Sequence, residues 1–375
     1  MRIRAFVATA SVLACLGLVF GCTAMMETKV GFAGPLTGPQ GNLGQELRNG
    51  ANLAVEKWNE GGGLKGKKVE LVSMDDEDQP EKAREVARSL CRKNPLFVVG
   101  HVDSGCSLEA AKVYKDHRVL MITPLSTNPA LTEGPYDNVF RLCGRDDRQG
   151  KAAAIWVIKH APSKTVGVVH DSSTYGKGLV EEFISNYQYL SGVNVLFNES
   201  VKRGENNLEN LLMKFAAAKP DVVFFGGLSP QGAALLKGLR ENGINATFMA
   251  GDGCFQQEFI DRAGPLAEGA IVSFYPDLTS LPGTGGAEFV KRYEQRFGAP
   301  PGPYAAFGYE AVSVGLTGVS NAAPPLSDRT IGEALKRLSF KSLLGILEFD
   351  GKGDIKGSPF VMWTVENGKF KELGV

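Results

Sequence analysis

Apolar stretches that suit β-strands alternate with amphipathic stretches that suit α-helices along nearly the whole chain. Several strand-like stretches are almost continuous in valine, isoleucine and phenylalanine, which is typical of parallel strands buried on both faces. The expected strands are residues 29–33, 68–74, 97–100, 119–122, 165–169, 193–197, 222–225, 247–250, 270–274 and 345–348. The expected helices include residues 47–59, 81–93, 149–160, 179–190 and 331–338. This alternation predicts an α/β fold with doubly wound parallel sheets. A chain of 375 residues exceeds one core and suggests two domains.

The N-terminus has the layout of an export signal. Two arginines precede an apolar run from Ala5 to Phe20. This run is shorter than a transmembrane helix requires and matches a secretory signal, so we expect residues 1–21 to be removed. Residues 18–22 resemble a bacterial lipobox, in which cleavage before the cysteine allows its lipidation. We therefore expect lipidation at Cys22, with ordinary cleavage of a soluble exported protein as the alternative.

Charge narrows the classes of partner. The chain has 41 basic and 41 acidic residues, and residues 1–21 contain two arginines and no acid. The mature chain therefore carries 39 bases against 41 acids, a net charge of −2. Nucleic-acid binding needs a basic footprint that is missing here, so no nucleic-acid partner is expected. No second long apolar segment follows, so we expect membrane association only through a lipid anchor.

Four cysteines remain beyond the signal and Cys22, namely Cys91, Cys106, Cys143 and Cys254. A bridge between Cys91 and Cys106 is not expected. The strand between them spans about 23 Å, whereas a disulfide needs Cα atoms within about 7 Å. Pairing of Cys143 with Cys254 stays open. No metal-ligand spacing links the cysteines to one another or to the histidines, so no metal site is expected.

Two strand ends run into small hydroxyl-rich loops. The strand at 97–100 leads to Ser104 at the start of a helical pattern, and the strand at 119–122 leads to Thr127. Free N–H groups and hydroxyls at the carboxyl end of a strand can cradle an anion. The structural alternative is an N-cap at Ser104 and a turn residue at Thr127. The pattern favours binding of a small ligand over its transformation.

Motifs for catalysis and for nucleotides are missing from the sequence. Residues 103–105 lack the G-x-S-x-G elbow of α/β-hydrolases. No G-x-G-x-x-G follows a strand, and the glycine-rich residues 60–66 lack the Walker-type ending. We therefore expect neither an enzymatic activity nor a cofactor, and an exported hydrolase ranks third among the alternatives.

Short motifs occur in one order at residues 37–39, 49–51, 61–66, 75–76, 100–101, 124–129, 141, 147–150, 170–171, 175–176 and 226–227. This series closely resembles the periplasmic leucine/isoleucine/valine-binding proteins of ABC transporters, which have a type I periplasmic binding fold. The resemblance spans essentially the whole mature chain. It places the ligand's carboxylate at Ser104, Leu125 and Thr127. It places Tyr175 and Asp252 on the ammonium side of the ligand.

Other positions qualify the resemblance. Candidate pocket-wall residues are Leu43, Ser126, Leu228, Phe274 and Tyr275. Leu43 and Leu228 stand where the family has tyrosines, and Asp252 replaces a longer glutamate. The family's paired cysteines fall on Asp78 and Asp103, so the resemblance implies that this disulfide is absent. The remaining apolar walls suit an aliphatic side chain. Phe274 and Tyr275 have hinge packing as their alternative role.

The resemblance also implies two lobes that the chain crosses three times, at residues 142–146, 273–277 and 349–353. The expected first lobe comprises residues 28–143 plus 276–349, and the second comprises residues 144–275 plus 350–375. The expected function is capture of an α-amino acid, with branched-chain amino acids as candidates, in the cleft between the lobes for delivery to an ABC permease. The expected location is extracytoplasmic, with a lipid anchor in a bacterial membrane. Alternatives are a receptor for another small carboxylate, amide or aromatic ligand, and a lipid-anchored interaction protein.

Overall fold

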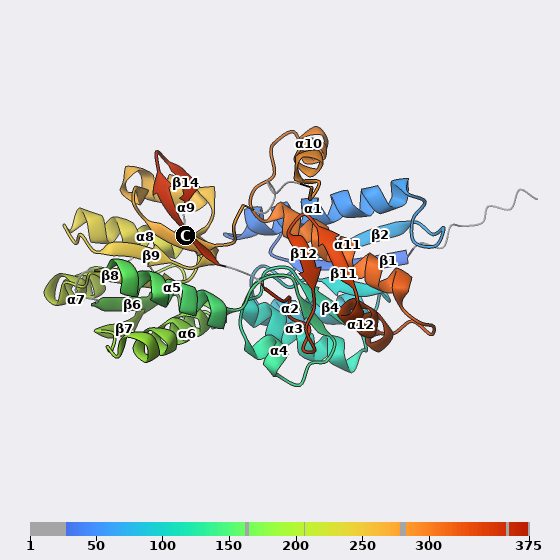
Figure 1. Cartoon of the computed structure of the whole chain (residues 1–375), viewed down its shortest axis with the longest axis horizontal. Helices are drawn as coiled ribbons and strands as arrows, with labels where there is room; N and C mark the ends of the chain where they lie inside the picture. The colour runs from blue at the N-terminus through green and yellow to red at the C-terminus, as the bar shows by residue number, and fades with distance from the viewer. Residues whose placement is uncertain (1–27, 162–164, 206, 278–282, 358–359, 374–375) are drawn as a thin grey trace, which may run out of the picture.

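The computed structural model describes residues 28–161, 165–205, 207–277, 283–357 and 360–373. The expected signal at residues 1–21 and the expected lipidation site Cys22 lie outside these ranges. Two lobes lie side by side along the long axis of the molecule, and each is a sheet covered by helices (Figure 1). No helix within the described ranges combines the length and the apolar character that crossing a bilayer requires.

The first lobe is built on a five-stranded parallel sheet in the order β2-β1-β3-β4-β5. Its strands are β1 (Thr28–Gly34), β2 (Val69–Asp75), β3 (Phe97–Val99), β4 (Leu120–Thr123) and β5 (Val139–Arg141). Strands β3, β4 and β5 are buried at every position because helices cover both faces of the sheet. The continuous apolar runs of the sequence thus become central strands.

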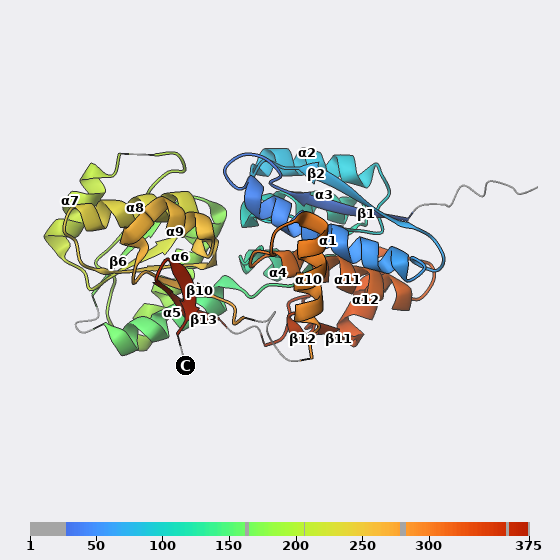
Figure 2. The same cartoon turned by 90° about the horizontal axis from the view of Figure 1, so that it is seen from above.

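Helices from distant parts of the chain sandwich this sheet (Figure 2). They are α1 (Gly41–Glu60), α2 (Pro80–Cys91), α3 (Ser104–Asp116), α4 (Ala130–Glu133), α10 (Gly286–Phe297), α11 (Ala305–Asn321) and α12 (Asp328–Arg337). Helices α1 and α11 pack closely because glycines lie at their contact. A Cβ atom on Gly50 would lie 1.9 Å from the carbonyl oxygen of Ala305, and one on Gly308 would lie 2.0 Å from that of Leu47. This contact ties the N-terminal segment to residues 286–348.

The second lobe contains a seven-stranded sheet in the order β14-β13-β10-β9-β8-β6-β7. Its strands are β6 (Val166–His170), β7 (Phe197–Ser200), β8 (Val222–Gly226), β9 (Thr247–Ala250), β10 (Ile271–Phe274), β13 (Val361–Glu366) and β14 (Lys369–Glu372). The first five are parallel, whereas β13 and β14 are antiparallel to their neighbours. The covering helices are α5 (Asp146–His160), α6 (Thr174–Ser191), α7 (Glu209–Ala218), α8 (Ser229–Glu241) and α9 (Gln257–Ala263). The predicted α/β fold of doubly wound sheets is confirmed.

The chain passes between the lobes after β5, after β10 and after the hairpin of β11 (Ser339–Ser342) and β12 (Gly345–Glu348). Each lobe therefore combines colours from separate parts of the chain in Figure 1. Residues 349–353, where the third crossing was expected, still lie against the first lobe. The N–H of Arg141 donates to the carbonyl of Gly353 at 2.8 Å. The backbones of Arg141 and Asp354 also pair in an isolated parallel β-bridge. Contacts with the first lobe thus continue to Ile355, which pairs with Phe349.

Strand predictions failed mainly at sheet edges. The strand expected at residues 193–197 is instead β7, which begins at Phe197 and pairs along one side only, with β6. Its side chains alternate between partly buried and exposed, so it lacks the continuous apolar signal of a central strand. Residues 345–348 form a strand as expected, but in an antiparallel hairpin. Strands β5, β11, β13 and β14 were missed.

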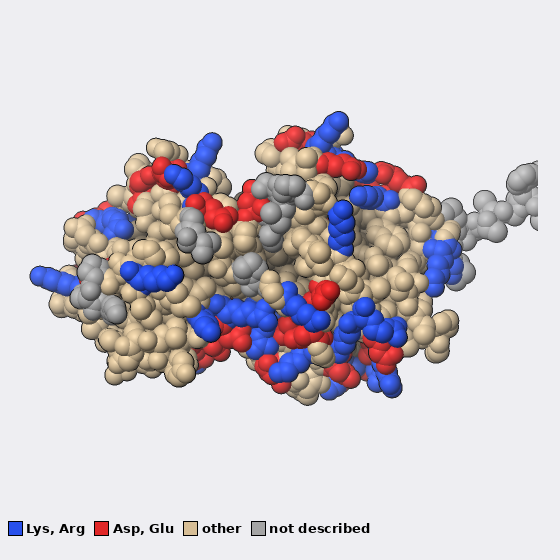
Figure 3. All heavy atoms as spheres, in the orientation of Figure 1, with Lys and Arg blue, Asp and Glu red and all other residues tan. Residues whose placement is uncertain are grey.

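Charged side chains of both signs are interspersed over the face shown in Figure 3. This arrangement agrees with the equal numbers of basic and acidic residues in the chain. The net charge therefore gives no indication of a polyanionic partner, and any ligand specificity rests on individual side chains.

Candidate ligand-binding site

The carboxyl ends of strands from both sheets meet at a small cavity between the lobes, of about 50 Å³. It is lined by Pro35, Gln40, Leu43, Asp78, Val102, Asp103, Ser104, Leu125, Tyr175, Leu228, Asp252, Gly253 and Tyr304. Six of the expected site residues are among them. The lobes lie close together in this conformation, so a ligand of amino-acid size requires them to part before it enters.

Ser104 and Leu125 form part of the first lobe's wall. Ser104 begins α3, and the side chain of Asp103 caps this helix by accepting from the N–H groups of Gly105 at 2.7 Å and Cys106 at 3.4 Å. The hydroxyl oxygen of Ser104 accepts from the N–H of Asn128 at 3.3 Å. A hydroxyl at a helix N-terminus, beside further N–H groups, is suited to bind an anion.

Thr127 lies behind this wall. Its hydroxyl is fully buried near the carboxyl of Asp146 and makes no hydrogen bond of regular geometry within the described chain. Ser126 is equally buried, but its hydroxyl donates to the carbonyl of Val102 at 2.9 Å and contacts the hydroxyl of Ser107 at 2.5 Å. The hydroxyl of Ser126 is thus committed to bonds within its own lobe, whereas that of Thr127 lies beside the carboxyl of Asp146.

Tyr175 and Asp252 form the second lobe's wall. The phenol of Tyr175 donates to the carboxylate of Asp252 at 2.6 Å and accepts from the N–H of Gly253 at 3.0 Å. Burial raises the pKa of Asp252 above its ordinary value, and the hydrogen bond from Tyr175 opposes this shift. A buried carboxyl with a raised pKa gains stability from a cation placed beside it.

A second buried acid lies near this wall, at the start of α5. Neither carboxylate oxygen of Asp146 has a hydrogen-bond partner of regular geometry among the described residues. Burial raises the pKa of Asp146 well above its ordinary value, and the negative charge of Asp252 raises it further. Asp146 and Asp252 are both buried and repel each other when ionised, so a cation bound beside them would be stabilised.

Phe274 and Tyr275 do not line the cavity. They are almost fully buried at the second crossing and contact each other with ring centroids 5.1 Å apart. The hydroxyl of Tyr275 accepts from the N–H of Gly144 at 2.6 Å, which joins the first and second crossings. These contacts favour the hinge-packing alternative for both residues.

Sequence reasoning missed several cavity residues. Tyr304 precedes α11, and its phenol donates to the backbone carbonyl of Asp252 at 2.9 Å. Gln40 precedes α1 and is buried, with no partner for its side-chain oxygen among the described residues. The position of each residue just before a long helix was the available signal. The sequence indicates no role for Asp78 and Asp103 beyond the loss of the family's disulfide at these positions.

All four described cysteines are free and buried, which answers the question left open for Cys143 and Cys254. Burial raises the pKa of the Cys91 thiol to about 11 and also raises that of Cys254. These thiols are therefore protonated at neutral pH, so they pack as small apolar groups.

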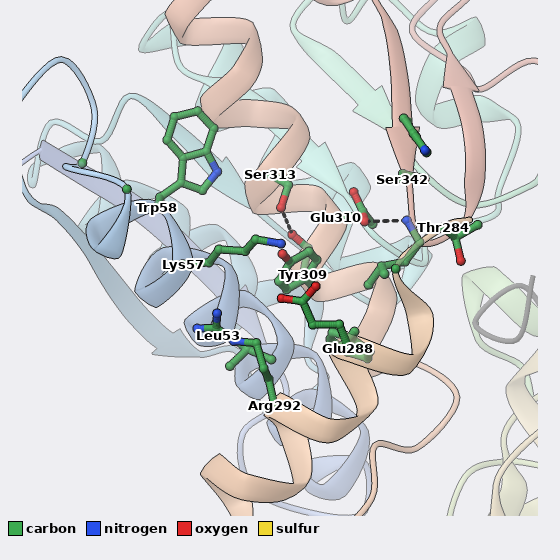
Figure 4. Close-up of a pocket in the computed structure, with 16 residues that line it drawn as sticks. Leu53, Lys57, Trp58, Thr284, Glu288, Arg292, Tyr309, Glu310, Ser313 and Ser342 are labelled. Atoms are coloured by element: carbon green, nitrogen blue, oxygen red, sulfur yellow. Dashed lines mark hydrogen bonds between the residues drawn. The ribbon is translucent and has the colours of Figure 1, made fainter. Parts of the chain in front are cut away.

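Another hollow, of about 410 Å³, lies on the first lobe between α1, α10, α11 and the β11–β12 hairpin (Figure 4). Lys57 projects over the ring of Tyr309 there, and the buried carboxylate of Glu310 accepts from the N–H of Leu343 at 2.7 Å. Burial raises the pKa of Glu310 to about 7. None of the expected site residues lines this hollow, and its mixed basic and acidic walls indicate no single ligand class.

Comparisons with known proteins agree with this architecture. A family model described as "Periplasmic binding protein" matches residues 27–369. "Leu/Ile/Val-binding protein homolog 1" of Brucella melitensis is 35% identical over 352 residues, 94% of each chain. The leucine-binding protein LivK of Thermotoga maritima superimposes with a TM-score of 0.84 at 28% identity, covering 92% of this chain and 98% of that one. LivJ of Streptococcus pneumoniae, solved with isoleucine, gives a TM-score of 0.82 at 25% identity over the same shares.

Proposed function

Because this chain belongs to the periplasmic binding protein family, we propose that it captures an α-amino acid between its lobes and delivers it to an ABC permease. The relatives named for leucine, isoleucine and valine make branched-chain amino acids the first candidates. The family implies an extracytoplasmic location. A lipid on Cys22 would hold the protein at the membrane near its permease.

The observation that supports this proposal is that an anion-binding group and a carboxylate lie on different lobes and line the same cavity. Ser104 on the first lobe stands at a helix N-terminus, where negative charge is stabilised. The carboxylate of Asp252 lies on the second lobe. A zwitterionic α-amino acid complements both, with its carboxylate toward Ser104 and its ammonium toward Asp252.

Binding and closure follow from this division of the site. The first lobe captures the carboxylate through Ser104 and the backbone at Leu125, with the hydroxyl of Thr127 buried behind them. Closure then brings Tyr175 and Asp252 onto the ammonium, which supplies the positive charge that the buried acids lack. A ligand that makes contacts with both lobes shifts the population toward the closed form.

The other cavity walls receive the ligand's side chain. Leu43, Leu125 and Leu228 contribute apolar surface from both lobes, which suits an aliphatic group. No reacting bond is required for capture and release, so we assign the site no catalytic step and no cofactor.

A calorimetric panel tests the proposal with purified protein. It compares L-leucine with 4-methylpentanoic acid, which lacks the amine, and with 3-methylbutylamine, which lacks the carboxylate. Binding of L-leucine or another α-amino acid, with at least about tenfold loss for both truncated analogues, is the expected result. Equal binding of the acid would replace this proposal with a receptor for simple carboxylates. Absence of binding across all twenty amino acids would reject it.

The lipid anchor has a separate test. Cells that express the full chain are labelled with a radioactive fatty acid, and the protein is recovered. Incorporation that disappears in Cys22→Ala supports lipidation at this residue. Label that persists in the variant would reject it.

A further inference from the structure

Arg203 of the second lobe reaches across to the first lobe beside the ligand cavity. Its guanidinium donates to Asp78 at 2.6 Å and to Asp103 at 3.1 Å, both on the first lobe. The third bond, at 3.1 Å, goes to Asp171 of its own lobe. A single side chain thus connects three carboxylates and both lobes. The planar guanidinium is the side chain best suited to such a fork of bonds.

The cluster depends on this one cation. Burial raises the pKa of Asp78, and the negative charge of Asp103 adds to the shift, whereas the positive charge of Arg203 opposes it. Asp103 and Asp171 lie within the same cluster and are nearly buried. Parting of the lobes would separate Arg203 from Asp78 and Asp103 and leave these two side chains without this counter-charge.

A metal ion does not account for the cluster better than Arg203 does. Ligand atoms of Asp78, Asp103 and Cys106 lie within 4.8 Å of one another. However, the guanidinium already supplies the positive charge, and burial raises the pKa of the Cys106 thiol, which keeps it protonated. The arrangement therefore suits an ion pair between lobes.

The cluster also contacts the ligand site. Asp78 and Asp103 line the cavity. While one carboxylate oxygen of Asp103 bonds to Arg203, the other accepts from the N–H of Gly105 and caps α3. Ser104 is the first residue of that helix. Asp103 therefore connects Arg203 with the helix that begins at Ser104, the residue proposed to face the ligand's carboxylate.

We propose that Arg203 is a positioning residue that latches the closed cleft through Asp78 and Asp103 and slows release of the ligand. This proposal rests on the function proposed above. The latch stabilises the closed form more than the open form, because its bonds to the first lobe require the lobes to be together. It acts on the dissociation rate, since its bonds to the first lobe must break before the lobes part and release the ligand. Because the side chain of Arg203 is partly exposed, salt should weaken its ion pairs with Asp78 and Asp103.

The test compares wild type with Arg203→Ala, Arg203→Lys and Asp103→Asn. Asparagine at position 103 retains the oxygen that caps α3 but removes the charge that pairs with Arg203. This variant therefore distinguishes loss of the ion pair from loss of the helix cap. Arg262→Ala is the matched control, because Arg262 pairs with Glu258 within its own helix. Dissociation of L-leucine is followed by stopped flow at about 0.01 M and about 1 M salt, between which the Debye length falls from about 30 Å to about 3 Å.

We expect Arg203→Ala to release L-leucine about tenfold faster than wild type at low salt, with little change in the association rate. Arg203→Lys should recover part of the loss, and Asp103→Asn should resemble Arg203→Ala. High salt should bring wild type toward the variants. A dissociation rate that is unchanged in Arg203→Ala, or a difference that is equal at both salt concentrations, would overturn the latch.

A measurement without ligand separates this proposal from the proposed function. Small-angle scattering of the ligand-free proteins should give a larger radius of gyration for Arg203→Ala than for wild type and Arg262→Ala. This result would support the latch even if no amino acid bound. Identical radii in low salt, together with unchanged leucine dissociation, would reject the latch while leaving amino-acid binding intact.

Discussion

The phenol of Tyr304 on the first lobe donates a hydrogen bond of 2.9 Å to the backbone carbonyl of Asp252 on the second. Both residues are nearly fully buried and line the cavity. The bond therefore connects closure of the lobes with the position of the carboxylate proposed to bind the ligand's ammonium. Such a bond between lobes can be removed without changing the charge of the site.

Tyr304→Phe should weaken L-leucine binding about fivefold to tenfold. The substitution removes one buried hydrogen bond between the lobes, which is typically worth about 1 kcal/mol, and leaves the carbonyl of Asp252 without its partner. Isothermal titration calorimetry measures the change. Tyr189→Phe is the control, because Tyr189 is 87% exposed. An unchanged affinity in Tyr304→Phe would show that this bond does not favour the liganded form.

Asp252→Asn should reduce affinity for L-leucine by more than about tenfold, because a buried ammonium would lose its charged partner. Binding of 4-methylpentanoic acid should change much less, since that ligand has no amine. Asp261→Asn, at an exposed position on α9, serves as the control. Equal losses for the two ligands in calorimetry would assign Asp252 a structural role only.

Glu310→Gln should make stability less dependent on pH. Burial raises the pKa of Glu310 from 4.5 to about 7, so the folded protein holds a proton in this range that the unfolded chain releases. The associated stability is complete below about pH 4.5 and is lost as the pH rises through about 7. Glutamine retains an oxygen to accept from Leu343.

The free energy of unfolding of wild type, measured in urea relative to Glu310→Gln, should therefore fall by up to about 3 kcal/mol between pH 4.5 and pH 8. Glu294→Gln, at an exposed position on α10, should follow wild type. Parallel pH profiles for wild type and Glu310→Gln would contradict the raised pKa.

Asp354→Asn should destabilise the protein by about 3 kcal/mol, because it leaves the buried guanidinium of Arg141 without its charged partner. Burial alone raises the pKa of Asp354, but Arg141 and Arg145 outweigh it and hold the pKa below its ordinary value. The stability from this pair is therefore present above the unfolded-state pKa and is lost as the pH falls through the folded-state pKa.

Urea unfolding at neutral pH measures this loss, with the exposed Asp137→Asn as the control. The difference between wild type and Asp354→Asn should shrink in acid, where both side chains are neutral. Equal stability of the two proteins at neutral pH would show that the pair between Arg141 and Asp354 contributes little.

The central strands were predictable because their burial on both faces leaves a local signal. Residues 222–225 and 248–250 are continuous apolar runs, and the structure places strands there. Strands β13 and β14 leave a weaker signal, since β14 is mostly exposed and belongs to an edge hairpin. The pairing of β13 with β10 joins segments about ninety residues apart, which no local periodicity encodes.

For the site, the sequence indicated Ser104 from a loop at a strand end and Asp252 through the family resemblance, and the structure brings both to one cavity. Sequence could not indicate that Tyr304 reaches Asp252, because their contact depends on how the lobes close. The same reason hid Arg203, which follows an edge strand and looks like an ordinary surface cation until it meets Asp78 and Asp103.

The sequence by itself determined the α/β architecture and the chemistry available at each strand end, since burial and local turns are written in neighbouring residues. Only the tertiary structure decided which of those ends face each other and which side chains bridge the lobes. The physical reason is that Arg203, Tyr304 and Asp354 gain their roles from partners at least 52 residues away, and those partners are brought together only when the chain has crossed between the lobes.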